Sequence, residues 1–119
     1  MSGPRGAGVD VEYLEAVMAV VREIPPGRVM TYGLIAEVVA ERLVVAGGEP
    51  RGGPRQVGAV MSHSDGDAPW WRVVTADGRV PAHHRARALQ ALRAEGAPLT
   101  SDDDDDARVR VRQAVWWPE

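Results

Sequence analysis

Clusters of proline and glycine limit the length of every helix that this chain can form. They lie at residues 24–27 (IPPG), 47–54 (GGEPRGGP) and 62–69 (SHSDGDAP). Proline lacks the backbone N–H that a helix interior requires, and glycine weakens a helix because it loses the most conformational freedom on folding. The chain is therefore restricted to short elements joined by turns and loops.

Between these clusters, apolar residues recur at the three- and four-residue spacing of an amphipathic helix. This spacing predicts helices over residues 9–23, 31–46, 55–63 and 86–95. Thr31 is suited to cap the second helix, because its hydroxyl can accept a hydrogen bond from the first turn. A helix, a turn and a short helix with a basic entry are typical of a helix-turn-helix DNA reader, although most helix pairs in small domains bind nothing.

The remaining elements are predicted to be strands. Residues 71–75 and 79–80 flank a turn at residues 76–78, which predicts a hairpin, and residues 108–112 (RVRVR) alternate as an edge strand does. The predicted fold class is mainly α: a winged helix-turn-helix-like helical domain with a small two-stranded β wing.

A chain of 119 residues is long enough for one domain with a modest core. We expect residues 1–8 to be a flexible leader, residues 9–99 the folded domain, and residues 100–119 an acidic loop and a tail that packs on the domain. The first residues do not resemble a signal peptide, and no apolar run approaches the roughly 20 residues that span a bilayer. These features predict a soluble, cytoplasmic protein.

The composition excludes some chemistry and favours one kind of surface. The chain has no cysteine, which excludes disulfides, a thiolate nucleophile and thiolate metal ligands. Its net charge of −3 includes the run Asp102–Asp106, whereas residues 51–93 hold seven arginines against three acids. Arginine pairs with phosphate and stacks on rings, so this middle region is a candidate anion-binding surface. A solvated arginine-rich face is the alternative.

Four separated segments carry a family resemblance. They are IPPGRVMTYGLIA (24–36), PRQVGAVMS (54–62), PWWRVVTADGRV (69–80) and LQALRAEG (89–96). In this order and spacing they resemble the DNA-binding domain of the O6-alkylguanine-DNA alkyltransferases. The chain is most similar to the alkyltransferase-like proteins, in which tryptophan replaces the cysteine that accepts the alkyl group.

The departure from the alkyltransferases concerns two neighbouring positions. Those enzymes carry Pro-Cys-His-Arg-Val, and this chain has Trp70 and Trp71 at the cysteine and histidine positions. An indole has no lone pair available for attack at neutral pH, so the nucleophile and its activator are both missing. The resemblance implies a monomeric protein that is not an enzyme and uses no cofactor. It implies binding to O6-alkylguanine in duplex DNA through the minor groove, nucleotide flipping, and signalling to nucleotide excision repair.

The resemblance also implies roles for single residues. Tyr32 would press on the phosphate of the target nucleotide, Arg55 would fill the gap left in the duplex, and Trp70 would form a wall for the extruded base. A packed tyrosine, a surface arginine and a core tryptophan are the structural alternatives. The expected DNA contacts are Thr31, Tyr32, Arg55, Gln56 and Ser62, and the expected pocket residues are Met61, Trp70, Trp71, Val73 and His83.

Several of these residues keep two interpretations. Met61 and Val73 suit either the pocket or the core, and Trp71 suits either the pocket wall or burial. His83 aligns best with an arginine that alkyltransferase-like proteins place at the pocket mouth, and His84 and Arg85 are adjacent to it.

Two further residues are expected to support the site. Arg72 would hold the site loop through backbone carbonyls or a carboxylate. Glu95 matches a pocket-floor carboxylate of the alkyltransferases, or it pairs with Arg93 or a helix cap.

Other functions remain open at this point. The spacing of the three histidines and of the acidic run does not predict a metal site. A winged-helix DNA-binding protein or transcription regulator without a lesion pocket is the main alternative. A glycosylase that uses Asp65 or Asp67 to activate water is another, and a protein-interaction module that uses the acidic loop and Trp116-Trp117 is a third.

Overall fold

The computed structural model of the chain describes residues 10–62, 68–102 and 106–118. In these ranges, no helix is long and apolar enough to cross a membrane. Some of the predictions above concern residues outside the described ranges, namely residues 1–9, His63, Asp65, Asp67 and residues 103–105 of the acidic loop.

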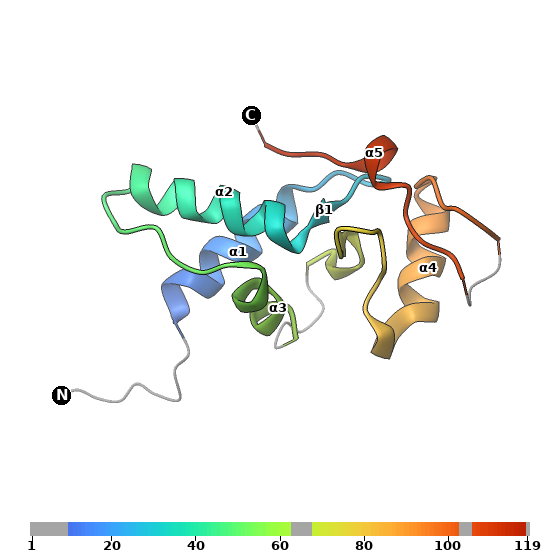
Figure 1. The fold of residues 1–119 in the computed structure, drawn as a ribbon, viewed down its shortest axis with the longest axis horizontal. Coiled ribbons are helices and arrows are strands. Elements are labelled where there is room, and N and C mark those ends of the chain that lie inside the picture. Colours follow the sequence, from blue (N-terminus) through green and yellow to red (C-terminus); the bar gives the residue numbers. More distant parts are fainter. Residues whose placement is uncertain (1–9, 63–67, 103–105, 119) are drawn as a thin grey trace.

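Helices make up most of the described fold (Figure 1). The first four lie within two residues of the predicted bounds, so these predictions are confirmed, whereas the short fifth helix was not predicted. The helices are α1 (Val11–Glu23), α2 (Tyr32–Val45), α3 (Pro54–Ser62), α4 (Arg85–Ala94) and α5 (Val111–Ala114), and the 3-10 turns are η1 (Trp70–Arg72) and η2 (Ala82–His84).

The helix ends follow from local side-chain chemistry. The Thr31 hydroxyl accepts a hydrogen bond from Leu34 N at 3.1 Å, which confirms it as the cap of α2. Asp10 caps α1 in the same way, because its carboxylate accepts from Tyr13 N at 3.0 Å. After α4 the chain turns at Gly96, whose φ of 81° belongs to the left-handed region that favours glycine.

The small sheet exists, but its pairing differs from the predicted hairpin. Strand β1 (Met30–Thr31) pairs in parallel with β2 (Val73–Val74), with Met30 opposite Val73 and Thr31 opposite Val74. The expected wing of residues 71–75 and 79–80 is therefore wrong, since residues 70–72 form η1 and residues 79–80 form no strand.

Physical reasons for this difference lie in the turn itself. The Thr75 side chain accepts a hydrogen bond from Arg79 N at 2.9 Å and Thr75 N donates to Arg79 O at 3.0 Å, which closes the turn. Pro81 then follows, and proline has no N–H with which to continue a ladder.

The edge strand expected at residues 108–112 is likewise reduced to a single bridge. Val109 pairs with Leu99 in antiparallel fashion, and the chain then enters α5. The carbonyl of Arg110 accepts hydrogen bonds from Gln113 N and Ala114 N, which form a helical turn in place of a strand.

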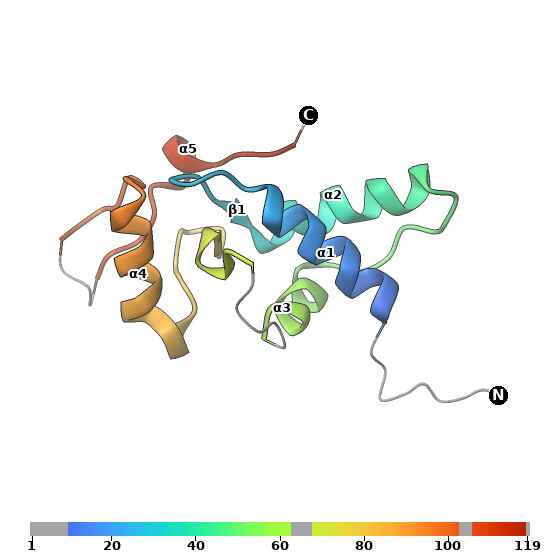
Figure 2. The same cartoon turned by 180° about the vertical axis from the view of Figure 1, so that it is seen from behind.

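The strand pair separates two hydrophobic cores. Met30 and Val73 are fully buried in the first core, which is built mainly from α1, α2 and α3. Val29 and Val74 are fully buried in the second core, which is built from α4 and the C-terminal segment, residues 106–118. Because successive side chains of a strand point to opposite faces, the residues of this short strand pair contribute to both cores. Figure 2 shows the same division from behind, with α1 and α2 at one end and α4 at the other.

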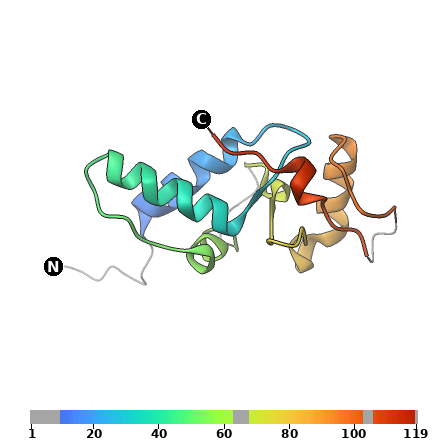
Figure 3. The same cartoon turned by 45° about the horizontal axis from the view of Figure 1, so that its top comes forward.

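The C-terminal segment crosses the fold and joins both cores (Figure 3). Val115 forms a parallel bridge with Val29, and Trp116 N donates to Val29 O at 2.9 Å. Trp116 packs against the first core, as expected for the tail, whereas 56% of Trp117 is exposed.

Candidate nucleic-acid interface

A surface hollow lies where the beginnings of α2 and α3 meet the turn after β2. Its volume is about 500 Å3. The residues that line it are Thr31, Tyr32, Gly33, Pro54, Arg55, Gly58, Thr75 and Ala76.

Tyr32 and Arg55 reach this hollow from different helices. Tyr32 is the first residue of α2 and is partly buried, and burial raises the pKa of its hydroxyl above the ordinary value. The hydroxyl therefore remains protonated at neutral pH and can donate a hydrogen bond to a phosphate oxygen. Arg55 is the second residue of α3 and is exposed. An aromatic hydroxyl and a guanidinium thus share one open surface.

The other expected DNA contacts lie close to these two residues in the chain and also serve the helix ends. The Thr31 hydroxyl caps α2, but it can still donate its own proton. The side chain of Gln56 accepts from Gly53 N at 2.9 Å and so orders the entry to α3. Ser62 is exposed, and its hydroxyl donates to Ala59 O at 2.9 Å.

The loop before α3 is fixed to α1 by an ion-pair network. Arg51 contacts Asp10 at 2.9 Å and Glu12 at 2.8 Å. The hydrogen bonds from Arg51 and from the backbone of Tyr13 hold the pKa of Asp10 below its ordinary value. Gly52 packs against the Tyr13 ring with a φ of 85°, a place that a larger residue cannot occupy. These contacts set the position of α3 and thus of Arg55.

Trp70 lies at the second core and is only partly buried. Its ring meets Trp71 edge to face at 5.6 Å between centroids, and it lies 5.4 Å from the ring of His84. His83 and His84 are both exposed, and their rings are 6.5 Å apart. The ring contact of Trp70 is thus with His84, whereas the family resemblance implied His83.

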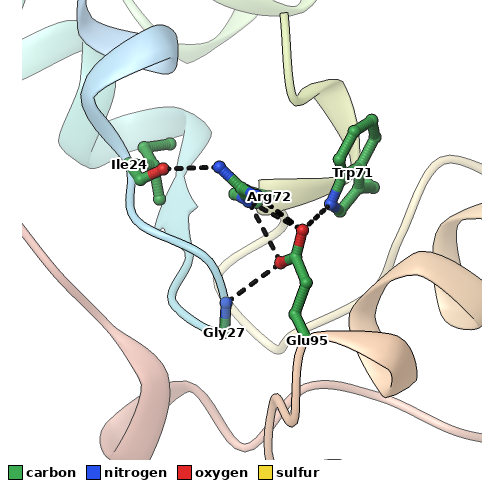
Figure 4. Close-up of polar contacts among 5 residues, drawn as sticks. All are labelled: Ile24, Gly27, Trp71, Arg72 and Glu95. Carbon is green, nitrogen blue, oxygen red and sulfur yellow. Dashed lines mark hydrogen bonds and ion pairs between the residues drawn. The ribbon is translucent and has the colours of Figure 1, made fainter.

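Trp71, Arg72 and Glu95 form a compact polar cluster (Figure 4). The Glu95 carboxylate accepts from Arg72 Nη2 at 2.6 Å, from Trp71 Nε1 at 2.8 Å and from Gly27 N at 3.0 Å. Arg72 also donates from Nη1 to the carbonyl of Ile24 at 2.7 Å, and its guanidinium lies 5.5 Å from the Trp71 ring centroid. Glu95 therefore pairs with Arg72, and Trp71 is part of this cluster.

The charge state of Glu95 reflects two opposing effects. Burial disfavours the ionised carboxylate, but the hydrogen bonds from Arg72, Gly27 and Trp71 outweigh it, so the pKa of Glu95 lies below its ordinary value. The side chains of Arg72 and Glu95 are only 13% and 14% exposed. Water therefore screens this pair less than a surface pair, and the cluster is held by an ionised carboxylate.

The structure places the expected site residues in two groups. Tyr32 and Arg55 line the hollow. Trp70 and Trp71 do not line it and instead contact each other, and Trp71 donates to Glu95. Val73 is fully buried in the first core, and Met61 is partly buried against it. Sequence reasoning missed Thr75 and Ala76 as lining residues, because it assigned them to a wing. The signal was present, since they follow directly after a buried strand.

The described residues give no indication of a metal centre. No group of three or more histidine, aspartate or glutamate side chains in them could hold a metal ion. Asp65 and Asp67, which the glycosylase alternative requires, lie outside the described ranges.

Helix α3 beside α2, with an exposed arginine at its start, is the arrangement of a helix-turn-helix DNA-binding domain. Residues 12–97 match the family model of the 6-O-methylguanine DNA methyltransferase DNA-binding domain, and the chain belongs to this family. The resemblance stated from the sequence is thereby confirmed.

Individual relatives agree with this assignment. The chain is 30% identical over 111 residues to a DNA base-flipping protein of Vibrio parahaemolyticus. The matched region covers 90% of this chain and 98% of that relative. It is similar to S. pombe Atl1 in a crystal structure with damaged DNA that contains O6-carboxymethylguanine, with a TM-score of 0.73 and 28% identity. A second S. pombe ATL structure in complex with DNA has a TM-score of 0.72 and 27% identity. Both similarities cover 92% of this chain and 99% of the other.

The Glu95 cluster leads to a prediction about acid stability. Because the pKa of Glu95 is lowered in the folded state, its contribution to stability is present at neutral pH and is lost as the pH falls through that lowered pKa. We expect Glu95→Gln to reduce the free energy of unfolding by roughly 2–3 kcal/mol at pH 7. At pH 3 the reduction should be smaller, because this pH lies below the ordinary pKa of a glutamate, so the unfolded chain binds a proton there and the folded state loses part of the stabilisation.

Urea denaturation at both pH values measures this difference. Glu37→Gln, which changes an exposed carboxylate on α2, is the control and should have little effect. An equal loss at pH 7 and pH 3 would contradict the role given to the ionised carboxylate.

Proposed function

We propose that this protein recognises O6-alkylguanine in duplex DNA by binding the minor groove and rotating the damaged nucleotide out of the stack. The observation that carries the proposal is the shared hollow of Tyr32 and Arg55. The base-flipping name of the Vibrio relative and the damaged DNA bound to S. pombe Atl1 support it.

The two side chains suit two parts of the flipping step. Rotating a base out of a duplex costs a few kcal/mol, and least where the base is damaged and poorly paired. The Tyr32 hydroxyl can bind the phosphate of the target nucleotide while its ring crowds the sugar. The Arg55 guanidinium is flat enough to occupy the vacated space and can hydrogen-bond the orphaned cytosine.

Trp70 and His84 together suit the reception of the extruded base. Their rings lie 5.4 Å apart at the edge of the second core, and His84 is exposed. An aromatic pair of this kind can stack against a base, and such stacking is worth about 1–3 kcal/mol per base. We place the wall of the lesion pocket at this pair.

The protein leaves the alkyl group on the base. No cysteine occurs in the chain to accept it, and an indole stands at the corresponding place. The Trp71 indole cannot replace the activating histidine either, because its N–H only donates, here to Glu95, and cannot take a proton from a nucleophile. Recognition without transfer makes the protein a sensor and not an enzyme.

A sensor requires a partner that removes the damage, and we infer that this partner belongs to nucleotide excision repair. Trp117, which is 56% exposed at the end of the tail, offers an aromatic contact for such a partner. Equal incision of a lesion duplex by a purified excision-repair system with and without this protein would contradict the inference.

The direct test of the proposed function compares two duplexes that differ only in one O6-methyl group. At one fixed salt concentration, we expect the dissociation constant for the lesion duplex to be lower by a factor on the order of ten or more, as one stacked base allows. Fluorescence anisotropy measures both constants. Equal affinity for the two duplexes would favour the alternative of a winged-helix DNA-binding protein without a lesion pocket.

Variants of single residues identify which contacts create the preference. Arg55→Ala should weaken binding to the lesion duplex more than binding to the plain duplex, whereas Arg42→Ala, which removes a charge paired with Glu23, should change neither. An equal loss on both duplexes for Arg55→Ala would mean that Arg55 only contacts a phosphate.

His84→Ala should reduce the preference for the lesion duplex by about fivefold, the equivalent of about 1 kcal/mol of stacking. The matched variant His83→Ala should leave this preference unchanged.

A further inference from the structure

A second pair of arginines lies beside the hollow, on the turn that follows β2. Thr75 and Ala76 begin this turn and line the hollow together with Arg55. Arg79 ends the turn, and Arg108 reaches it from the C-terminal segment. Two cations that are 29 residues apart in the chain therefore meet next to the candidate DNA surface.

The turn and the C-terminal segment are locked together by backbone contacts. Val109 N donates to Gly78 O at 2.9 Å. Gly78 is buried with a φ of 87°, and a Cβ at this position would collide with the backbone of Val109. The platform that carries Arg79 and Arg108 is thus held by the backbone and does not depend on the two side chains.

One carboxylate lies between the two guanidinium groups. Asp77 Oδ2 is 3.3 Å from Arg79 Nε and 3.8 Å from Arg108 Nη1. The hydrogen bond from the Thr75 hydroxyl lowers the pKa of Asp77, and the two arginines act in the same direction. The charges of these three groups, an ionised Asp77 and two guanidinium groups, add up to one positive charge.

Both arginines are accessible to a ligand. The side chains of Arg79 and Arg108 are 59% and 46% exposed. Exposed ion pairs are weak, typically 0–1 kcal/mol, so either guanidinium can exchange the shared carboxylate for a phosphate. Arg51 is bound differently, because it contacts two carboxylates and holds the loop before α3.

We propose that Arg79 and Arg108 form a phosphate clamp that holds the DNA backbone beside the hollow, with Asp77 drawing both guanidinium groups to one place. The proposal rests on the proposed function, since it assigns a further part of the same DNA surface. Guanidinium groups suit this ligand because their paired N–H donors match two phosphate oxygens. The clamp contributes to affinity for any duplex and reads no base.

The salt dependence of binding tests the clamp. Each phosphate contact contributes about 0.9 to the slope of log K against log salt concentration. We expect Arg79→Gln and Arg108→Gln each to reduce this slope by about one and to weaken plain and lesion duplexes equally. When the salt concentration is raised fourfold, the factor by which affinity falls should be about three- to fourfold smaller for each variant than for the wild type.

Arg42→Gln is the charge-matched control. Arg42 lies ten residues beyond Tyr32 on α2, about 15 Å along the helix, and it pairs with Glu23. Its slope should equal that of the wild type. Thermal melting of each variant checks that the fold is intact, which we expect because the side chains are exposed.

Each outcome decides a specific point. Unchanged slopes for both clamp variants, with the lesion preference retained, would overturn the clamp and leave the proposed function standing. A selective loss of lesion binding would also overturn it, because it would place these arginines in the pocket. Reduced slopes in a protein that shows no lesion preference would support the clamp and contradict the proposed function.

Discussion

The Glu95 carboxylate is the contact on which the arrangement of this protein depends. It binds Arg72, Trp71 and the backbone of Gly27, and Arg72 in turn binds the carbonyl of Ile24. Ile24 belongs to the first core, whereas Glu95 ends the helix that builds the second. Apart from this cluster, the two cores share the short strand pair and the C-terminal segment. The partly buried ion pair of Arg72 and Glu95, together with its hydrogen bonds to Trp71, Gly27 and Ile24, therefore joins the two cores.

The proposed function uses both halves. The first presents Tyr32 and Arg55 on α2 and α3, where they can open a duplex, and the second presents Trp70 beside His84, where a base can stack. Trp71 occupies the position at which an alkyltransferase carries its activating histidine, and here its N–H binds Glu95. In this chain a site that resembles a catalytic centre is thus held together by structural contacts, and no cysteine is present in the chain to accept an alkyl group.

Local signals in the sequence predicted the helices well, and non-local pairing was the part that they could not predict. The cap at Thr31 depends on residues within a few positions and is found as expected, and the turn at Gly96 is likewise local. The pairing of Met30 with Val73 joins residues 43 apart, and a two-residue strand leaves no pattern that would indicate its partner. The choice between His83 and His84 depends on a 3-10 turn, whose period differs from that of a helix or a strand. Membership of a family gave the roles of Tyr32 and Arg55, which remain predictions.

The proposed function requires that the damaged nucleotide leaves the duplex and returns to it unaltered. A fluorescent cytosine analogue that brightens when it is unpaired, placed opposite O6-methylguanine, reports this directly. We predict that saturating protein raises its fluorescence on the lesion duplex and that the signal returns to its starting value when high salt releases the protein. Unchanged fluorescence at saturation would mean that the base stays in the stack, and this result would contradict the account.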